Sequence, residues 1–114
     1  MAIEVITEFI AKTTIRIIAY IYDDDGALVD PTGCAAGGYL CVTLIITDPD
    51  GTVVVPSEGD GDDTMTRSAK GIYEYYYKTT TSSTKEWWHG EVMAVDGTTP
   101  DDYTSLGTFG FRLK

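Results

Sequence analysis

The stretch YLCVTLIITDPDG, residues 39–51, joins a long strand pattern to a turn. Its apolar residues alternate with other residues, which is the period of a strand that turns one face to a core. The alternating residues are Leu40, Val42, Leu44 and Ile46. Pro49 presets φ for a turn, Asp48 can accept backbone N–H groups, and Gly51 tolerates a positive φ. The stretch therefore predicts a strand over residues 39–47 that ends in a tight turn.

Strand patterns of this kind recur along the whole chain, separated by Gly, Pro and Asp, and no segment shows a helical period. We expect the other strands at residues 3–10, 15–22, 52–55, 64–69, 71–78 and 86–95, with a last strand around 108–113. Loops are expected at residues 27–38 and 96–105. About seven or eight short antiparallel strands predict an all-β fold, a sandwich of two sheets, in a single domain that spans residues 1–114.

Charge and hydropathy exclude several classes of function. The chain has 18 acidic and 8 basic residues and a net charge of -10, so it should repel the phosphates of a nucleic acid. No apolar run approaches the roughly 20 residues of a membrane span, and the N-terminus lacks the pattern of a secretory signal. We therefore expect neither nucleic-acid binding nor membrane insertion. A virion component or a domain of an exported surface protein fits these features better than a cytoplasmic enzyme.

Five pieces of the sequence, taken in order, resemble bacterial and archaeal immunoglobulin-like domains of the macroglobulin and surface-adhesin type. They are Asp25-Gly26 with Val29-Asp30, residues 42–51, Gly71-Ile72-Tyr73, residues 88–95 and Phe109-Gly110-Phe111. The resemblance covers nearly the whole chain and implies an immunoglobulin-like sandwich with a scaffold, adhesion or interaction role. It also implies that Tyr73 forms a tyrosine corner, in which the hydroxyl of a buried phenol bonds to an upstream backbone group.

The sequence offers little for catalysis. His89 is the only histidine, so any catalytic triad or Cys-His pair would have to be built around it. No Gly-x-Ser-x-Gly motif is present. A histidine beside two tryptophans in a strand more often serves packing or a surface. We therefore expect no catalytic residues and no enzymatic activity.

Three acidic clusters could bind a cation: residues 23–25, Asp48 with Asp50, and an acidic Gly-rich loop. The loop is the sharpest candidate, because calcium prefers oxygen ligands and glycine lets such a loop curl around the ion. Its candidate metal ligands are Glu58, Asp60, Asp62 and Asp63. No closing Glu of an EF-hand follows, and acidic loops are more often solvated turns. The expected cofactor is therefore none, with calcium as the alternative.

Two cysteines, Cys34 and Cys41, have six residues between them, which is wrong for a zinc knuckle. A disulfide over so short a loop would contribute about 2 to 3 kcal/mol and would need an oxidising compartment. Two free thiols are the alternative, and the sequence leaves both open.

Aromatic residues are more numerous than one core of this size needs, at eight Tyr and two Trp. Strict alternation places Trp88 in the core with Val92 and Ala94, and leaves Trp87 outside it. The candidate interface or ligand residues are Tyr39, Tyr76, Trp87 and His89. Exposed aromatic rings on a sheet can stack on sugars or anchor a protein interface. Alternatively, a loop or a neighbouring subunit covers them.

These features together favour a non-catalytic structural or protein-interaction module that assembles with itself or with other protein subunits. A sheet edge offers unpaired N–H and C=O groups to a partner strand, and the first predicted strand begins close to the N-terminus. The alternative function is a module that binds a carbohydrate or a calcium-dependent ligand.

Overall fold

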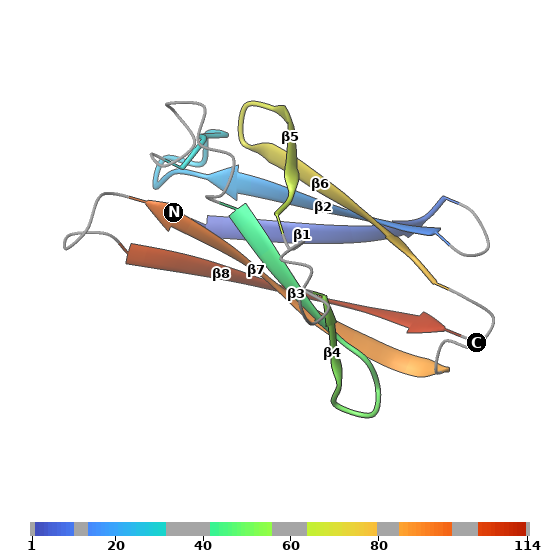
Figure 1. The fold of residues 1–114 in the computed structure, drawn as a ribbon. Coiled ribbons are helices and arrows are strands. Elements are labelled where there is room, and N and C mark those ends of the chain that lie inside the picture. Colours follow the sequence, from blue (N-terminus) through green and yellow to red (C-terminus); the bar gives the residue numbers. More distant parts are fainter. Residues whose placement is uncertain are drawn as a thin grey trace.

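A computed structural model describes residues 2–10, 14–31, 42–55, 64–79, 85–96 and 103–113. These residues form eight strands and no helix (Figure 1). The strands are β1 (Ala2–Phe9), β2 (Thr14–Tyr22), β3 (Val42–Thr47), β4 (Val53–Val55), β5 (Thr66–Ala69), β6 (Ile72–Lys78), β7 (Glu86–Asp96) and β8 (Tyr103–Leu113). The described part of the chain contains no helix that is long and apolar enough to cross a membrane.

The eight strands form two antiparallel sheets of four. One sheet has the order β1-β2-β6-β5, here called sheet A, and the other has the order β4-β3-β7-β8, here called sheet B (Figure 1). With letters assigned in chain order, these are the A-B-E-D and C′-C-F-G sheets of an immunoglobulin-like sandwich. The predicted fold class, an all-β immunoglobulin-like sandwich of seven or eight strands, is therefore confirmed.

The core lies between the two sheets and is built from the alternating residues of their inner faces. Its centre consists of aliphatic side chains of β2, β3 and β7 that are fully buried, namely Ile15, Ile17, Ala19, Ile21, Leu44, Ile46, Val92 and Ala94. Trp88 is 2% exposed and stacks on Phe111 at 5.7 Å between ring centroids. Trp87, its neighbour in the strand, is 53% exposed. The predicted division of the two tryptophans between core and surface is therefore confirmed.

The prediction of a loop over residues 96–105 is wrong at both of its bounds. Strand β7 continues to Asp96 and β8 already begins at Tyr103. One ladder without a register shift joins these strands, from Glu86 opposite Leu113 to Asp96 opposite Tyr103. Pairing with a long partner strand therefore extends both strands, and at Asp96 it includes a residue type that is otherwise depleted in strands. The first part of the predicted strand 39–47 and most of the loop 27–38 lie outside the described residues.

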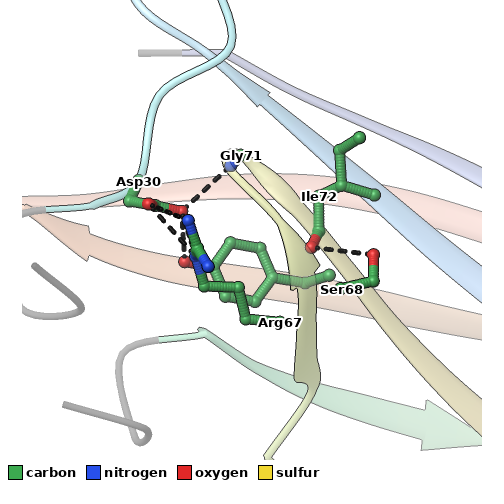
Figure 2. A network of polar contacts seen from close by, with 6 residues as sticks. Asp30, Arg67, Ser68, Gly71 and Ile72 are labelled. Carbon is green, nitrogen blue, oxygen red and sulfur yellow. Dashed lines mark hydrogen bonds and ion pairs between the residues drawn. The ribbon is translucent and has the colours of Figure 1, made fainter. Parts of the chain in front are cut away.

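The segment that follows β2 is fastened to the β5–β6 hairpin by the carboxylate of Asp30 (Figure 2). Its Oδ1 accepts hydrogen bonds from the Gly71 N–H and the Tyr73 hydroxyl, both at 2.9 Å. Arg67 donates from Nη2 to Oδ2 at 3.0 Å and from Nε at 3.1 Å. These contacts, with the Arg67 bond first, lower the pKa of Asp30 to about 2 although burial opposes the shift. One carboxylate thus bonds to three residues of the hairpin, namely Arg67, Gly71 and Tyr73.

Gly71 is required at this junction for two reasons. Its φ is +73°, which residues with a side chain rarely adopt. A Cβ there would also lie 2.8 Å from the backbone nitrogen of Val29. Its carbonyl also accepts the N–H of Ile21 at 2.8 Å. The Gly71-Ile72-Tyr73 motif therefore marks a close approach of the hairpin to the segment after β2.

Tyr73 is buried as predicted, but the predicted partner of its hydroxyl is wrong. The hydroxyl donates to the Asp30 side chain and not to an upstream backbone carbonyl. A carboxylate forms the stronger bond because its charge assists it. Burial is the main reason why the pKa of Tyr73 is raised, and the Asp30 carboxylate adds to it.

Tyr73→Phe is expected to lower the free energy of unfolding by about 1 kcal/mol, because the acceptor keeps its bonds from Arg67 and Gly71. Urea unfolding followed by circular dichroism measures the change. The loss should disappear when Asp30 is already replaced by Ala, which leaves the hydroxyl without this acceptor. An equal loss in that background would mean that the hydroxyl acts through another partner.

Candidate functional site

The predicted interface residues do not come together at one place. Tyr76 is exposed on the outer face of sheet A, because its neighbours Tyr75 and Tyr77 pack against the core. Trp87 and His89 are exposed on the outer face of sheet B, on the opposite side of the sandwich. Tyr39 lies outside the described residues. Trp87 and His89 are therefore the pair around which a site can be built.

A shallow hollow of about 590 Å³ lies around these two residues, on the outer face of sheet B. Three neighbouring strands form it, with β7 in the middle and β3 and β8 on its two sides. It is lined by Ile45, Thr47, Trp87, His89, Gly90, Glu91, Thr108, Phe109 and Gly110. We call it the sheet B hollow.

Strand register sets the order of side chains in the sheet B hollow. One row across the three strands consists of Thr47, His89 and Gly110, which stand opposite one another. A second row consists of Ile45, Glu91 and Thr108. Trp87 precedes the first row along β7, and its ring carbons Cε3 and Cζ3 would lie 3.8 and 3.9 Å from a Cβ at Gly110. One exposed aromatic ring therefore stands beside a bare glycine and a set of polar side chains.

The backbone immediately before Trp87 is strained. Glu86 has a φ of 103°, and no other described non-glycine residue has a positive φ. Such a conformation costs on the order of 1 to 3 kcal/mol for a residue with a side chain and is often found near functional sites. The Glu86 carboxylate lies 3.5 Å from Nη2 of Arg112 on β8, so an exposed ion pair accompanies the strained residue.

The lining of the sheet B hollow combines an apolar platform with hydrogen-bonding groups. Trp87 and Ile45 provide apolar surface, while the hydroxyls of Thr47 and Thr108 can both donate and accept. His89 adds ring nitrogens and Glu91 adds acceptor oxygens. A site of this composition can bind a molecule that has both an apolar face and several hydroxyl or amide groups.

A smaller hollow of about 290 Å³ lies on sheet A and is lined by Thr64, Thr66, Glu74, Tyr75 and Tyr76. Its carboxylate is already engaged, since Nη2 of Arg16 lies 2.7 Å from Oε2 of Glu74. Arg16 also contacts Glu8 on β1 at 3.0 Å. Tyr76 therefore lies next to a closed ion-pair network across β1, β2 and β6.

The predicted calcium ligands Glu58, Asp60, Asp62 and Asp63 lie outside the described residues. The other two acidic clusters are described, and their first residues have a different role. Oδ1 of Asp23 accepts the N–H groups of Asp25 and Ala27, and Oδ1 of Asp48 accepts those of Asp50 and Thr52. Both are side chains that organise a turn. Over the described ranges, no three His, Cys, Asp or Glu side chains gather to hold a metal ion. Cys34 and Cys41 also fall outside these ranges.

The four sheet edges differ in how they are protected. Strands β4 and β5 have three and four residues, and their pairings contain register shifts at Ile46/Thr47 and Arg67/Ala69. β8 is long, but β1 packs beside it. A Cβ at Gly107 would lie 2.8 Å from Ile3, and the Thr7 hydroxyl donates to the carbonyl of Gly110 at 3.4 Å. Short length and bulges are two common ways to block an open edge.

β1 is neither short nor bulged, and its residues that contact β8 include the partly buried Ile3 and Thr7. It pairs with β2 through eight consecutive residues without a register shift, and β2 is the only strand paired with it in the described part of the chain. Three apolar side chains on this strand and just after it are exposed, namely Ile6, Phe9 and Ile10. An edge that is long, regular and apolar is the kind that pairs with another chain.

No protein-family model, curated protein or solved structure matches this chain. The resemblance to immunoglobulin-like domains of the macroglobulin and surface-adhesin type therefore stays a prediction at the level of the family. The arguments about function that follow rest on the residues of the chain itself.

Sequence reasoning found Trp87 and His89 but missed the partners that complete the hollow. Thr47 was predicted in a strand but was not assigned to a site, and neither were Glu91, Thr108 and Gly110. The sequence did contain a signal for these residues, since each occupies an outward position in an alternating pattern. What the sequence lacked was the register that places β3 and β8 beside β7.

Proposed function

We propose that this domain is a non-catalytic interaction module that assembles with a second copy of itself, or with another protein subunit, through the edge of β1. A role as a building block of a cell surface or virion would use such a contact. The observation that supports the proposal is the contrast between edges: β4 and β5 are short and bulged, whereas β1 is long and regular.

A partner strand beside β1 would extend sheet A by main-chain hydrogen bonds, which need no particular side chains. Exposed Ile6, Phe9 and Ile10 would add apolar area to that contact. The negative charge of Glu8 opposes this pairing only weakly, because Nη1 of Arg16 lies 3.0 Å from its Oε1 and neutralises it. Glu4 is the remaining acidic residue of the strand.

The net charge of -10 works against self-association. Like charges repel over a distance of about 8 Å at physiological salt and over much longer distances at low salt. Assembly should therefore increase with ionic strength if a second copy is the partner. A basic partner subunit would show the opposite dependence, because salt would weaken its attraction.

Size-exclusion chromatography with light scattering, run over a range of protein concentration and salt, tests the proposal. We expect the mass to rise with concentration and with salt, and the β1 amides to gain protection from hydrogen exchange. The double change Ile6→Lys with Phe9→Lys should keep the protein monomeric, since Lys is a common blocking residue of edge strands. Val53→Lys is the matched control, because Val53 is 48% exposed against 54% for Phe9 but lies on the already protected β4.

A monomer at every concentration and salt would contradict self-assembly. If association survives the β1 double change but is lost with Val53→Lys, the contact is made by β4 of sheet B and not by β1. Addition of calcium or a chelator in the same experiment shows whether a bound cation contributes.

A further inference from the structure

Gly110 has no explanation in the packing or the backbone of the fold. A Cβ there would meet no atom closer than 3.4 Å, and its φ is not positive. The other two described glycines within strands differ: a Cβ at Gly90 would collide with the ring of Phe109, and one at Gly107 would lie 2.8 Å from Ile3. Glycine in a strand interior weakens the strand and often marks a bulge, a bend, or a place where a ligand or another backbone approaches closely.

The effect of Gly110 is to keep the sheet B hollow open beside Trp87. The outward neighbours of Gly110 on β8 are Thr108 and Arg112, which both carry long or branched side chains. A side chain larger than a methyl group at Gly110 would extend toward the Trp87 ring, which already lies within 4 Å of the Cβ position. The exposed ring face and the bare backbone therefore form one open surface.

This surface is held in place before any ligand arrives. At His89 and Glu91, β7 pairs with β3 on one side and with β8 on the other, and Trp87 lies two residues before His89, opposite Arg112 of β8. The ladder to β8 has no register shift over its eleven pairs. A site on a central strand loses little conformational entropy when it binds.

The chemistry of the lining favours a neutral sugar ring. Such a ring has an apolar face of C–H groups that can stack on an indole, and hydroxyls around its rim that can pair with Thr, His and Glu side chains. The hollow volume of about 590 Å³ lies within the range of small-molecule sites, which is about 300 to 1,000 Å³. Anionic ligands are disfavoured, because Glu91 lines the site and the chain carries a charge of -10.

We propose that the sheet B hollow is a binding site for a neutral saccharide, in which one sugar ring stacks on Trp87 above Gly110 and its hydroxyls bond to His89, Glu91, Thr47 and Thr108. This site lies on the outer face of sheet B whereas the β1 edge belongs to sheet A, so the two proposals can fail independently, although the Thr7 hydroxyl of β1 contacts the Gly110 carbonyl. Saccharide binding does not require assembly, and assembly through β1 leaves the outer face of sheet B open.

A panel of neutral tetrasaccharides tests the proposal: cello-, xylo-, manno- and malto-tetraose and the fully N-acetylated chitotetraose at millimolar concentration, with tetragalacturonate as the anionic control. The chain has two tryptophans, so two indole N–H signals report binding in a nitrogen-15 correlation spectrum. We expect at least one neutral member to shift the signal of Trp87 and to leave that of buried Trp88 almost unchanged. The anionic control should bind more weakly than any neutral ligand that binds.

Two variants address the site in different ways. Trp87→Ala removes the platform, and Gly110→Leu fills the hollow without straining the backbone; each should weaken binding at least about tenfold. Tyr76→Ala is the matched control, because that ring is 52% exposed but lies on sheet A, and it should leave the affinity within about twofold. Unfolding midpoints of all three variants establish that they remain folded, and weakened binding is then measured by ligand-detected spectra.

No shift with any member of the panel would overturn the proposal. Binding that Trp87→Ala and Gly110→Leu leave intact would also overturn it, since the ligand would then occupy another surface. A Trp87 signal that moves with protein concentration alone would assign this face to contact with a second copy, and would contradict the saccharide site.

Discussion

Trp88→Ala is expected to lower the free energy of unfolding by about 3 to 5 kcal/mol, the largest loss for a single core residue in this domain. The change removes an indole that is 2% exposed and leaves a cavity between the sheets. It also removes the stack on Phe111, at 5.7 Å and 18° between planes, and the contact with Tyr77 at 5.8 Å. Chemical unfolding monitored by circular dichroism measures the difference.

The neighbouring tryptophan provides the control. Trp87→Ala deletes the same side chain from the same strand, but this ring is 53% exposed, so we expect a loss below about 1 kcal/mol. The contrast tests the register of β7, because a shift of one residue moves every side chain to the other face. If Trp87→Ala were the more damaging change, β7 would be paired one residue away from the register described here.

The alternating pattern was sufficient to predict which face of most strands enters the core. In β2, the residues that share a face with Ile15 and Ile21 are all fully buried, and in β7 the same rule separates Trp88 from Trp87. Side-chain periodicity is a local property, which is why it can be read without knowing the fold. Strand ends were less predictable, as the extension of β7 to Asp96 shows, because they depend on the length of the partner strand.

Contacts between distant parts of the chain were not predictable in the same way. Asp30 and Tyr73 are 43 residues apart, and each was noted only as part of its own short motif. The rows of the sheet B hollow likewise combine residues of β3, β7 and β8 that are far apart in sequence. Only strand order and register bring them together, and neither follows from composition or local pattern.

Asp30→Ala is expected to lower the free energy of unfolding by about 2 to 4 kcal/mol, more than any other single polar change described here. It leaves the buried hydroxyl of Tyr73 and the N–H of Gly71 without their acceptor. Arg67 contributes less to the loss, because its side chain is 50% exposed and water can replace the carboxylate. Asp30→Asn should cost less than Ala, because an amide oxygen can still accept one of these bonds. Equal losses for Ala and Asn would show that the charge, rather than the hydrogen bonds, carries the effect.

The same carboxylate predicts a specific dependence of stability on pH. The pKa of Asp30 is about 2 in the folded protein, against 3.8 for the unperturbed group, so the folded state binds its proton less readily than the unfolded chain does. The stabilisation is therefore fully present above about pH 4 and is lost as the pH falls toward about 2. The shift corresponds to about 1 to 2 kcal/mol once solvent screening at the half-exposed Arg67 is allowed for. Unfolding free energies of the wild type and of Asp30→Asn should therefore converge by this amount between about pH 5 and pH 2. Parallel pH curves for the two proteins would mean that the Asp30 carboxylate titrates normally and does not carry the ion pair with Arg67.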